Sequence, residues 1–308
     1  MSSPEFLWSN TYNEWSPEHM ESPELIAGSC ICCDGNRLSK SPAVLMPFVA
    51  LRVFGHEPLE ITADWGLRDL RQGMAYTLCN SLQCQGCGAL FLDYRFTDKQ
   101  MTALYQGYRD ESYTRQRNHF EPGYAAVAEH YRGREAYISD VEAWLAPHLP
   151  ALPAVLDWGG GSGINTPFLL QHSLLHVHDI SAVELVKGAE RVGPEQVVKG
   201  RYDLVVCSQV LEHVSFPLAL IEEIHAALGP QTLLYLEVPH EALMREHRGS
   251  LDLARLKRHW HEHVNFFSEQ SLHCLLDRAG LVLVDSYFLP VNLGWRQGEV
   301  MGVLARRA

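Results

Sequence analysis

The stretch from Val155 to Gly163 constrains the fold of this 308-residue chain more than any other. It runs Val-Leu-Asp-Trp-Gly-Gly-Gly-Ser-Gly, and its apolar, partly β-branched start predicts a buried strand. Glycines follow the strand, and Ile164–Leu170 is predicted to open a helix. Glycine lets the main chain approach a ligand closely, and a helix start offers unpaired N–H groups. The stretch therefore predicts a strand, a turn and a helix that bind a cofactor.

The spacing of these glycines separates two cofactor classes. A dinucleotide site expects Gly-x-Gly-x-x-Gly, but its third glycine position is Ile164 or Thr166, depending on the register. An NAD-dependent enzyme is therefore disfavoured, and a purely structural glycine turn is the other alternative. The run fits instead Asp-x-Gly-x-Gly-x-Gly, with its residues at Asp157, Gly159, Gly161 and Gly163.

Two further segments have the features of strands from the same sheet. His176–Ser181 predicts a second strand that ends near Asp179, whose carboxylate can accept hydrogen bonds from both ribose hydroxyls. The helix predicted after Asp179 is short, and the alternative for Asp179 is the N-cap of that helix. Tyr202–Val214 predicts a fourth strand followed by the sequence Leu-Glu-His-Val. The third strand, near Gln196–Val198, is only weakly indicated, and no residue that would bracket an adenine is evident after it.

Together these segments resemble the motifs of class I S-adenosylmethionine (SAM) methyltransferases over residues 150–308. The resemblance implies an α/β, Rossmann-like sheet of seven strands with the last strand antiparallel. For His213 a structural role is the alternative to a place beside the cofactor. The residues that the resemblance places on SAM are Asp157, Gly159, Gly161, Gly163, Asp179, Ser208, Gln209 and His213.

Composition and charge exclude several classes of protein. The formal net charge of −12 argues against nucleic-acid binding, which needs a basic face. No apolar run approaches membrane-spanning length, and the first residues lack the pattern of a signal peptide. We therefore expect a cytoplasmic protein that binds neither nucleic acid nor membrane. Eight cysteines in such a chain indicate a metal site or free thiols rather than disulfides.

Four of the cysteines form two Cys-x-x-Cys pairs, Cys30 with Cys33 and Cys84 with Cys87. Four thiolates at this spacing favour a tetrahedral, structural zinc site. Ordinary reduced core cysteines are the alternative, and Cys32 and Cys79 are the predicted non-ligands. The paired knuckles resemble the zinc-binding domain that precedes the catalytic domain of some sugar methyltransferases.

The domain organisation follows from these motifs. We expect an irregular arm over 1–28, a zinc-binding domain over 29–95, a helical lid or linker over 96–150 and the methyltransferase domain over 151–308. The arm carries four aromatic residues and is expected to dock on the body or on a second subunit, so a homodimer is one alternative. Residues from Tyr124 to Leu145 predict one long amphipathic helix.

An insertion from Pro239 to His263 carries a local excess of Arg, Lys and His in an otherwise acidic chain. It follows the fifth predicted strand, and ligands of open α/β sheets lie beyond the carboxyl ends of the strands. The insertion therefore favours an anionic small-molecule acceptor such as a nucleotide-sugar. A solvated helix face is the alternative.

The segment His259–Ser268 carries the candidate general base. Histidine titrates near neutral pH, so His261 or His263 can take a proton from the acceptor, with Glu262 orienting a ring or a hydroxyl. The segment resembles the His-Glu-His-Val motif of sugar C-methyltransferases, in which the histidine matching His263 removes a proton beside a keto group. Those enzymes have tyrosine where this chain has Trp260, and we expect no C-terminal domain of their kind here. O- and C-methylation both stay open.

Two functions are therefore predicted. The first is a SAM-dependent methyltransferase that acts on a sugar or a sugar-like natural product. The second is a catalytically inactive SAM-fold subunit that serves as a binding module, suggested by the weak third strand and the missing adenine contact. The intact glycine motif argues against the second.

Overall fold

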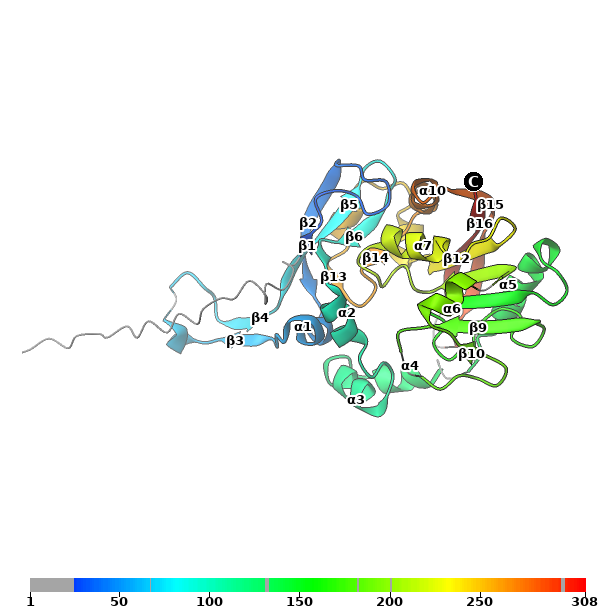
Figure 1. The fold of residues 1–308 in the computed structure, drawn as a ribbon. Coiled ribbons are helices and arrows are strands. Elements are labelled where there is room, and N and C mark those ends of the chain that lie inside the picture. Colours follow the sequence, from blue (N-terminus) through cyan, green and yellow to red (C-terminus); the bar gives the residue numbers. More distant parts are fainter. Residues whose placement is uncertain (1–24, 67, 131–132, 182, 200, 295–296) are drawn as a thin grey trace, which may run out of the picture.

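The computed structural model describes residues 25–308, except 67, 131–132, 182, 200 and 295–296. Most of the predicted arm, residues 1–24, lies outside the described residues. Two sheets, of seven and of five strands, organise the chain, and two shorter pairs of strands accompany them (Figure 1). None of the helices over the described residues combines the length and the apolar character that crossing a bilayer requires.

The seven-stranded sheet has the order β10-β9-β8-β11-β12-β16-β15. Its first five strands pair in parallel, and β16 runs antiparallel to both β12 and β15. This is the predicted Rossmann-like methyltransferase sheet with an antiparallel final strand. Its strands are β8 (Ala154–Trp158), β9 (Leu174–His178), β10 (Glu190–Arg191), β11 (Leu204–Ser208), β12 (Leu233–Pro239), β15 (Leu281–Asn292) and β16 (Gln297–Arg307).

The five-stranded sheet joins N-terminal strands to strands from far along the chain. Its order is β13-β2-β5-β6-β14, and it consists of β2 (Leu38–Leu45), β5 (Leu78–Cys84), β6 (Leu90–Leu92), β13 (His259–Trp260) and β14 (Asn265–Phe266). The segment that follows β12 therefore completes the N-terminal sheet at both of its edges. The two short pairs are β1 (Leu25–Ile26) with β7 (Tyr94–Arg95), and β3 (Leu59–Ile61) with β4 (Gly73–Ala75).

Short helices cover the sheets and form the connections. In chain order they are α1 (Pro47–Phe54), η2 (Ala63–Trp65), α2 (Asp98–Tyr105), α3 (Glu111–Phe120), α4 (Tyr124–His130), α5 (Ile138–Leu145), η3 (Ala146–His148), α6 (Pro194–Lys199), α7 (Pro217–His225), α8 (Ala242–Glu246), α9 (Leu253–Leu256) and α10 (Glu269–Arg278). Capping boxes at Thr97 and Ser268 begin α2 and α10.

The two faces of the seven-stranded sheet are buried against different helices. Along β11, Val205 and Cys207 face a core that also contains α7 and α10, whereas Leu204 and Val206 face α5. This alternation is the period of two that a strand imposes on its side chains. The core of α7 and α10 also takes in one face of the N-terminal sheet, so these helices lie between the two sheets (Figure 1).

Three predicted elements on the methyltransferase side are wrong. Ile164–Leu170 forms turns instead of a helix, because the Arg134 guanidinium binds the carbonyl oxygens of Ile164 and Thr166 at 2.6 and 3.0 Å. Gln196–Val198 lies in helix α6, which starts at Pro194, and the third strand is β10 instead. Among the described residues between β9 and β10, none is helical, so the short helix predicted there is absent too.

The single long helix predicted from Tyr124 to Leu145 is also wrong. The structure divides it into α4 and α5, with non-helical residues from 133 to 137 between them. Gly133 lowers helix propensity at this point. The backbone N–H of Glu135 donates to the Asn165 side chain at 2.8 Å. It therefore binds the glycine-rich connection and makes no hydrogen bond within a helix.

Candidate functional site

The connection from β8 to β9 is a loop whose glycines adopt conformations that other residues avoid. Gly159, Gly161 and Gly163 have φ values of 79°, 58° and 79°. A Cβ on Gly159 would lie 2.6 Å from Val210 Cγ2. Asp157 is buried before the loop and accepts a hydrogen bond from the Thr166 hydroxyl, and burial raises the pKa of Asp157 to about 7. The loop is thus a main-chain cradle that needs glycine.

Asp179 lies at the carboxyl end of β9 and is tied to this loop. One carboxylate oxygen accepts from the Gly161 N–H at 2.8 Å, and the other accepts from the Ser181 N–H at 2.6 Å. No described residue between Asp179 and β10 is helical, so Asp179 is not a helix N-cap there. The structure therefore brings a carboxylate from the second strand to the glycine loop of the first.

The ends of β11 and β12 meet at a buried acid that sequence reasoning missed. Glu237 is fully buried and accepts hydrogen bonds from Ser208 Oγ at 2.8 Å and Gln209 Nε2 at 3.0 Å. The hydroxyls of Tyr137 and Tyr235 donate to it at 2.9 and 2.5 Å. The predicted Ser208 and Gln209 are therefore fixed by Glu237. An acid inside the apolar run Leu-Leu-Tyr-Leu-Glu-Val was the available signal.

The turn after β11 carries His213 from the glycine loop toward helix α2. His213 N–H donates to the Val210 carbonyl at 3.0 Å, and Val210 itself packs on Gly159. His213 Nδ1 lies 2.7 Å from the Tyr105 hydroxyl and 3.2 Å from the backbone oxygen of Glu262. Burial lowers the pKa of His213 to about 3, so its imidazole is neutral.

His263 lies against His213 and is held by an acid from the end of β12. The two rings meet edge to face, with centroids 4.6 Å apart. His263 Nδ1 lies 2.7 Å from Glu241 Oε1. Burial acts to lower the pKa of His263, but the hydrogen bond to Glu241 and the charge of Glu212 outweigh it, and the pKa is raised. We call Glu212, His213, Glu241 and His263 the histidine cluster.

Glu212 is the least satisfied member of the histidine cluster. It is 1% exposed, and neither carboxylate oxygen has a hydrogen-bond partner among the described residues. His213 Nε2 lies 3.7 Å from Glu212 Oε1, beyond hydrogen-bond reach. Burial raises the pKa of Glu212 to about 8. Sequence reasoning passed over Glu212, because a glutamate in Leu-Glu-His-Val shows no sign of burial by itself.

Asn265 supports this turn from β14. Its side-chain N–H groups donate to the carbonyls of Leu211 at 2.8 Å and Val214 at 2.7 Å. The backbone N–H of Val264 donates to the Glu212 carbonyl at 2.7 Å. The His-Glu-His-Val segment therefore positions the Leu-Glu-His-Val turn, although 50 residues separate them in sequence.

The other two predicted catalytic residues face helix α3. Glu262 accepts from Arg117 at 2.7 Å and from the Tyr113 hydroxyl at 3.2 Å. Burial acts to raise the pKa of Glu262, but the charge of Arg117 outweighs it and the pKa falls to about 2. His261 Nδ1 lies 3.3 Å from Glu121. The structure thus separates His261 and Glu262 from His263, as expected for histidines two residues apart.

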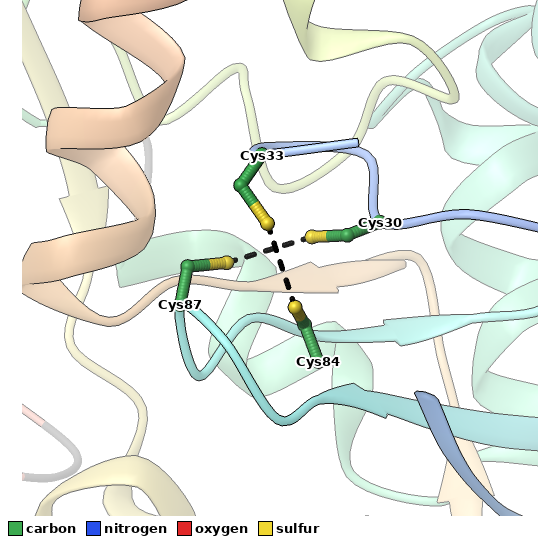
Figure 2. A group of neighbouring side chains, drawn as sticks. All are labelled: Cys30, Cys33, Cys84 and Cys87. Carbon is green, nitrogen blue, oxygen red and sulfur yellow. Dashed lines mark hydrogen bonds between the residues drawn. The ribbon is translucent and has the colours of Figure 1, made fainter. Parts of the chain in front are cut away.

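The four predicted zinc ligands converge from two loops (Figure 2). Sγ of Cys30 lies 3.5 Å from that of Cys87, and Sγ of Cys33 lies 3.5 Å from that of Cys84. All four sulfurs lie within 4.8 Å of one another. Tetrahedral zinc with Zn–S bonds of about 2.3 Å requires sulfurs roughly 3.8 Å apart. The cluster is therefore compatible with a zinc site.

The basic insertion packs in part on the N-terminal sheet, and Arg248, Arg255 and Arg258 are exposed. The backbone oxygen of Lys257 accepts from Ser81 at 2.5 Å, and the Lys257 ammonium lies over the rings of Trp260 and Phe266. Trp260 is buried and donates its indole N–H to Ser81 at 2.8 Å. Arg248 pairs with an acid of α10. Only some of the basic side chains of the insertion are therefore available to contact a ligand.

Comparison with known proteins agrees with this architecture. A methyltransferase domain family matches residues 128–286, just over half of the chain. Among solved structures, 1,6-didemethyltoxoflavin-N1-methyltransferase of Burkholderia thailandensis, with bound S-adenosylhomocysteine, is 23% identical with a TM-score of 0.43, over 56% of this chain and 79% of that one. Magnesium protoporphyrin IX methyltransferase of Synechocystis PCC 6803 is 17% identical with a TM-score of 0.43, over 67% and 99%.

No curated protein matches the chain in sequence. The family match spans the strands β8 to β12 and the turn that carries His213, together with the start of β15. The chain therefore belongs to the methyltransferase domain family and is a class I SAM-dependent methyltransferase.

Proposed function

We propose that this enzyme methylates a small molecule that lies at the carboxyl edge of the seven-stranded sheet, between the glycine loop and the histidine cluster. One observation carries the proposal: Val210, at the start of the turn that holds Glu212 and His213, packs directly on Gly159. A cofactor on the glycine loop and an acceptor on the histidine cluster are therefore neighbours. In open α/β sheets this edge is where ligands bind.

The residues proposed to hold SAM are those of the glycine loop and its neighbours. The loop fits a cofactor because its three left-handed glycines carry no side chain that would keep a ligand from the main chain. Asp179 is placed to accept from the ribose hydroxyls, while Ser208 and Gln209 border the loop from β11. SAM supplies a methyl group already activated on a sulfonium. The protein has to hold the acceptor in line and to take up its proton.

We assign the uptake of the acceptor's proton to His263 instead of His261. Glu241 holds Nδ1 of His263, which leaves Nε2 for the acceptor, and His213 fixes the ring from the side of the glycine loop. His261 is directed to Glu121, at the end of α3. Glu262 acts as a positioning residue, because its carboxylate anchors the segment to Arg117 and its backbone oxygen binds His213.

The acceptor we propose is a sugar or a sugar-like natural product, methylated at oxygen or carbon. The His-Glu-His-Val segment supports this class. An anionic group such as a nucleotide diphosphate is favoured by Arg245 in α8, whose buried Nε has no hydrogen-bond partner among the described residues. The four-cysteine cluster is proposed to hold a structural zinc ion, since four thiolates leave no open coordination position.

Calorimetry with S-adenosylhomocysteine and an activity screen test the proposal. The wild type should bind the cofactor product, and a panel of nucleotide-sugars should reveal an acceptor through its release of S-adenosylhomocysteine from SAM. His263→Ala should abolish turnover and keep cofactor binding, whereas His261→Ala should keep both. Absence of binding at millimolar cofactor would refute the proposal and favour the inactive binding subunit.

A further inference from the structure

Glu212 stands out among the buried acids around the site. Glu237 is fully buried and the Glu262 side chain is 14% exposed, and each accepts hydrogen bonds from named donors. Glu212 has none among the described residues. A buried carboxyl group without a hydrogen-bond partner is unfavourable in either protonation state, and its ionised form costs several kcal/mol unless a cation is bound. The site is therefore prepared for a cation that comes from outside the chain.

The two histidines beside Glu212 each have one nitrogen occupied and one free for a ligand. The Glu262 backbone oxygen can only accept and the Tyr105 hydroxyl can do either, so a proton on Nδ1 of His213 suits both contacts and leaves the lone pair on Nε2. His263 Nδ1 likewise faces the carboxylate of Glu241, which leaves Nε2. Metal-binding histidines characteristically donate the second ring N–H to a carbonyl or a carboxylate in this way.

We propose that Glu212, His213 and His263 bind a divalent transition-metal ion of the zinc class, separate from the four-cysteine cluster. The ligand atoms that these three residues offer lie within 4.8 Å of one another. Metal–ligand bonds of about 2.0–2.2 Å require the side chains to draw together around the ion. Two imidazoles and one carboxylate leave coordination positions open, unlike four thiolates.

The open coordination positions let the ion bind the acceptor, and this role of the ion rests on the proposed function. The site adjoins the glycine loop through Val210, so an acceptor hydroxyl can complete the coordination. Coordination lowers the pKa of the hydroxyl, and its proton leaves to water. The oxygen then forms the new O–C bond while the S–C bond of SAM breaks. In the metal-free protein, His263 takes the proton as described above.

Metal content of the full-length protein tests the inference. The protein is stripped with a chelator, reloaded with Co2+ and analysed by plasma mass spectrometry and absorption. We expect two equivalents per chain, one with intense thiolate-to-cobalt absorption and one with only weak visible bands. Glu212→Gln, which is close to isosteric, should lose the weakly absorbing equivalent and keep the thiolate one. His259→Gln, in an exposed histidine of the same segment, should keep both.

One equivalent in the wild type, or two in Glu212→Gln, would overturn the inference. Should Glu212→Gln fail to fold by circular dichroism, the spectrum of the loaded wild type decides, because the thiolate bands alone would count against the second site. Methyl transfer and cofactor binding that persist in the stripped protein without a second equivalent would leave the proposed function intact and refute only the metal. Loss of cofactor binding under all conditions would refute the proposed function instead.

Discussion

The ion pair between Arg117 and Glu262 gives the most direct test of how the candidate site is held. Both side chains are almost enclosed, with 10% and 14% of their surfaces exposed, and the closest N–O distance is 2.7 Å. Replacing Arg117 by Met keeps the bulk and removes the cation that pairs with Glu262 and, at 2.9 Å, with Glu121. Breaking a buried pair in this way costs about 3–5 kcal/mol. The fall of the Glu262 pKa from 4.5 to about 2, at about 1.4 kcal/mol per pKa unit, independently gives roughly 3 kcal/mol.

The assay is urea unfolding of Arg117→Met at neutral and acidic pH. A depressed carboxyl pKa contributes stability above about pH 4.5 that is lost as the pH falls toward 2. The difference between the wild type and Arg117→Met should therefore be about 3 kcal/mol at pH 7 and should narrow below pH 4.5. Arg117→Met with Glu262→Gln should recover part of the loss, because the unpaired charge of Glu262 is gone while Glu121 keeps only His261 as a partner among the described residues.

Arg115, two residues earlier on α3, is the matched control. Its pair with Glu111 is exposed on both sides, at 72% and 93%. Exposed pairs contribute about 0–1 kcal/mol, so Arg115→Met should leave the free energy of unfolding almost unchanged. If Arg117→Met costs no more than Arg115→Met, or if its cost does not depend on pH, the assigned role of the buried pair is wrong.

Three further substitutions test the glycine loop, the cysteine cluster and a helix cap. Gly159→Ala should weaken SAM binding by about tenfold or more, roughly 1.4 kcal/mol, because its Cβ would lie 2.6 Å from Val210. Gly249→Ala, at a matching φ of 77° in open space, should bind normally, and equal calorimetric affinities would contradict the loop assignment. Cys84→Ser should lose the thiolate-bound metal and unfold at lower temperature, because metal binding there contributes to folding, while Cys274→Ser should keep the metal. Ser268→Ala should lower the free energy of unfolding by about 1–2 kcal/mol in urea, because Oγ caps α10 and also donates to the Cys87 carbonyl; an unchanged value would refute this.

The sheet was predictable because its central strands are buried on both faces. Such strands are continuous apolar runs, and Leu204–Ser208 and Leu233–Pro239 both show that pattern. The positions of Asp157 and Asp179 at strand ends followed from the same runs. The local sequence was sufficient to predict a strand wherever the apolar residues of that strand indicated its burial.

The loop after Gly163 was not predictable, because its conformation is set by a distant residue. Arg134 takes up the carbonyl oxygens of Ile164 and Thr166, which would otherwise accept helical hydrogen bonds. Nothing in Ile164–Leu170 indicates that an arginine 30 residues earlier lies there. The proposed cofactor site therefore consists of a loop and neighbouring strands, without the helix start that the sequence predicted.

Dependence on residues distant in the sequence also distinguishes the site residues that were missed from those that were predicted. His263 could be predicted as a candidate because its motif is local, whereas the environment of Glu212 depends on several separate segments. The backbone of Val264 and the side chain of Asn265 hold its turn, and Tyr105 of α2 covers His213. Burial of an acid cannot be inferred from Leu-Glu-His-Val until these segments are assembled.

The placement of β13 and β14 links the N-terminal sheet to His263, the proposed general base. His261 to Val264 span the short interval between the two strands, and both strands pair with N-terminal partners, β2 and β6. Strand β5, which pairs with both β2 and β6, ends in Cys84 of the cysteine cluster. His263 is therefore held between two strands of the N-terminal sheet, and the cysteine cluster lies at the end of a third strand of that sheet. We accordingly expect loss of the thiolate-bound metal to lower turnover through the position of His263, while the glycine loop, which belongs to the other sheet, keeps its affinity for SAM.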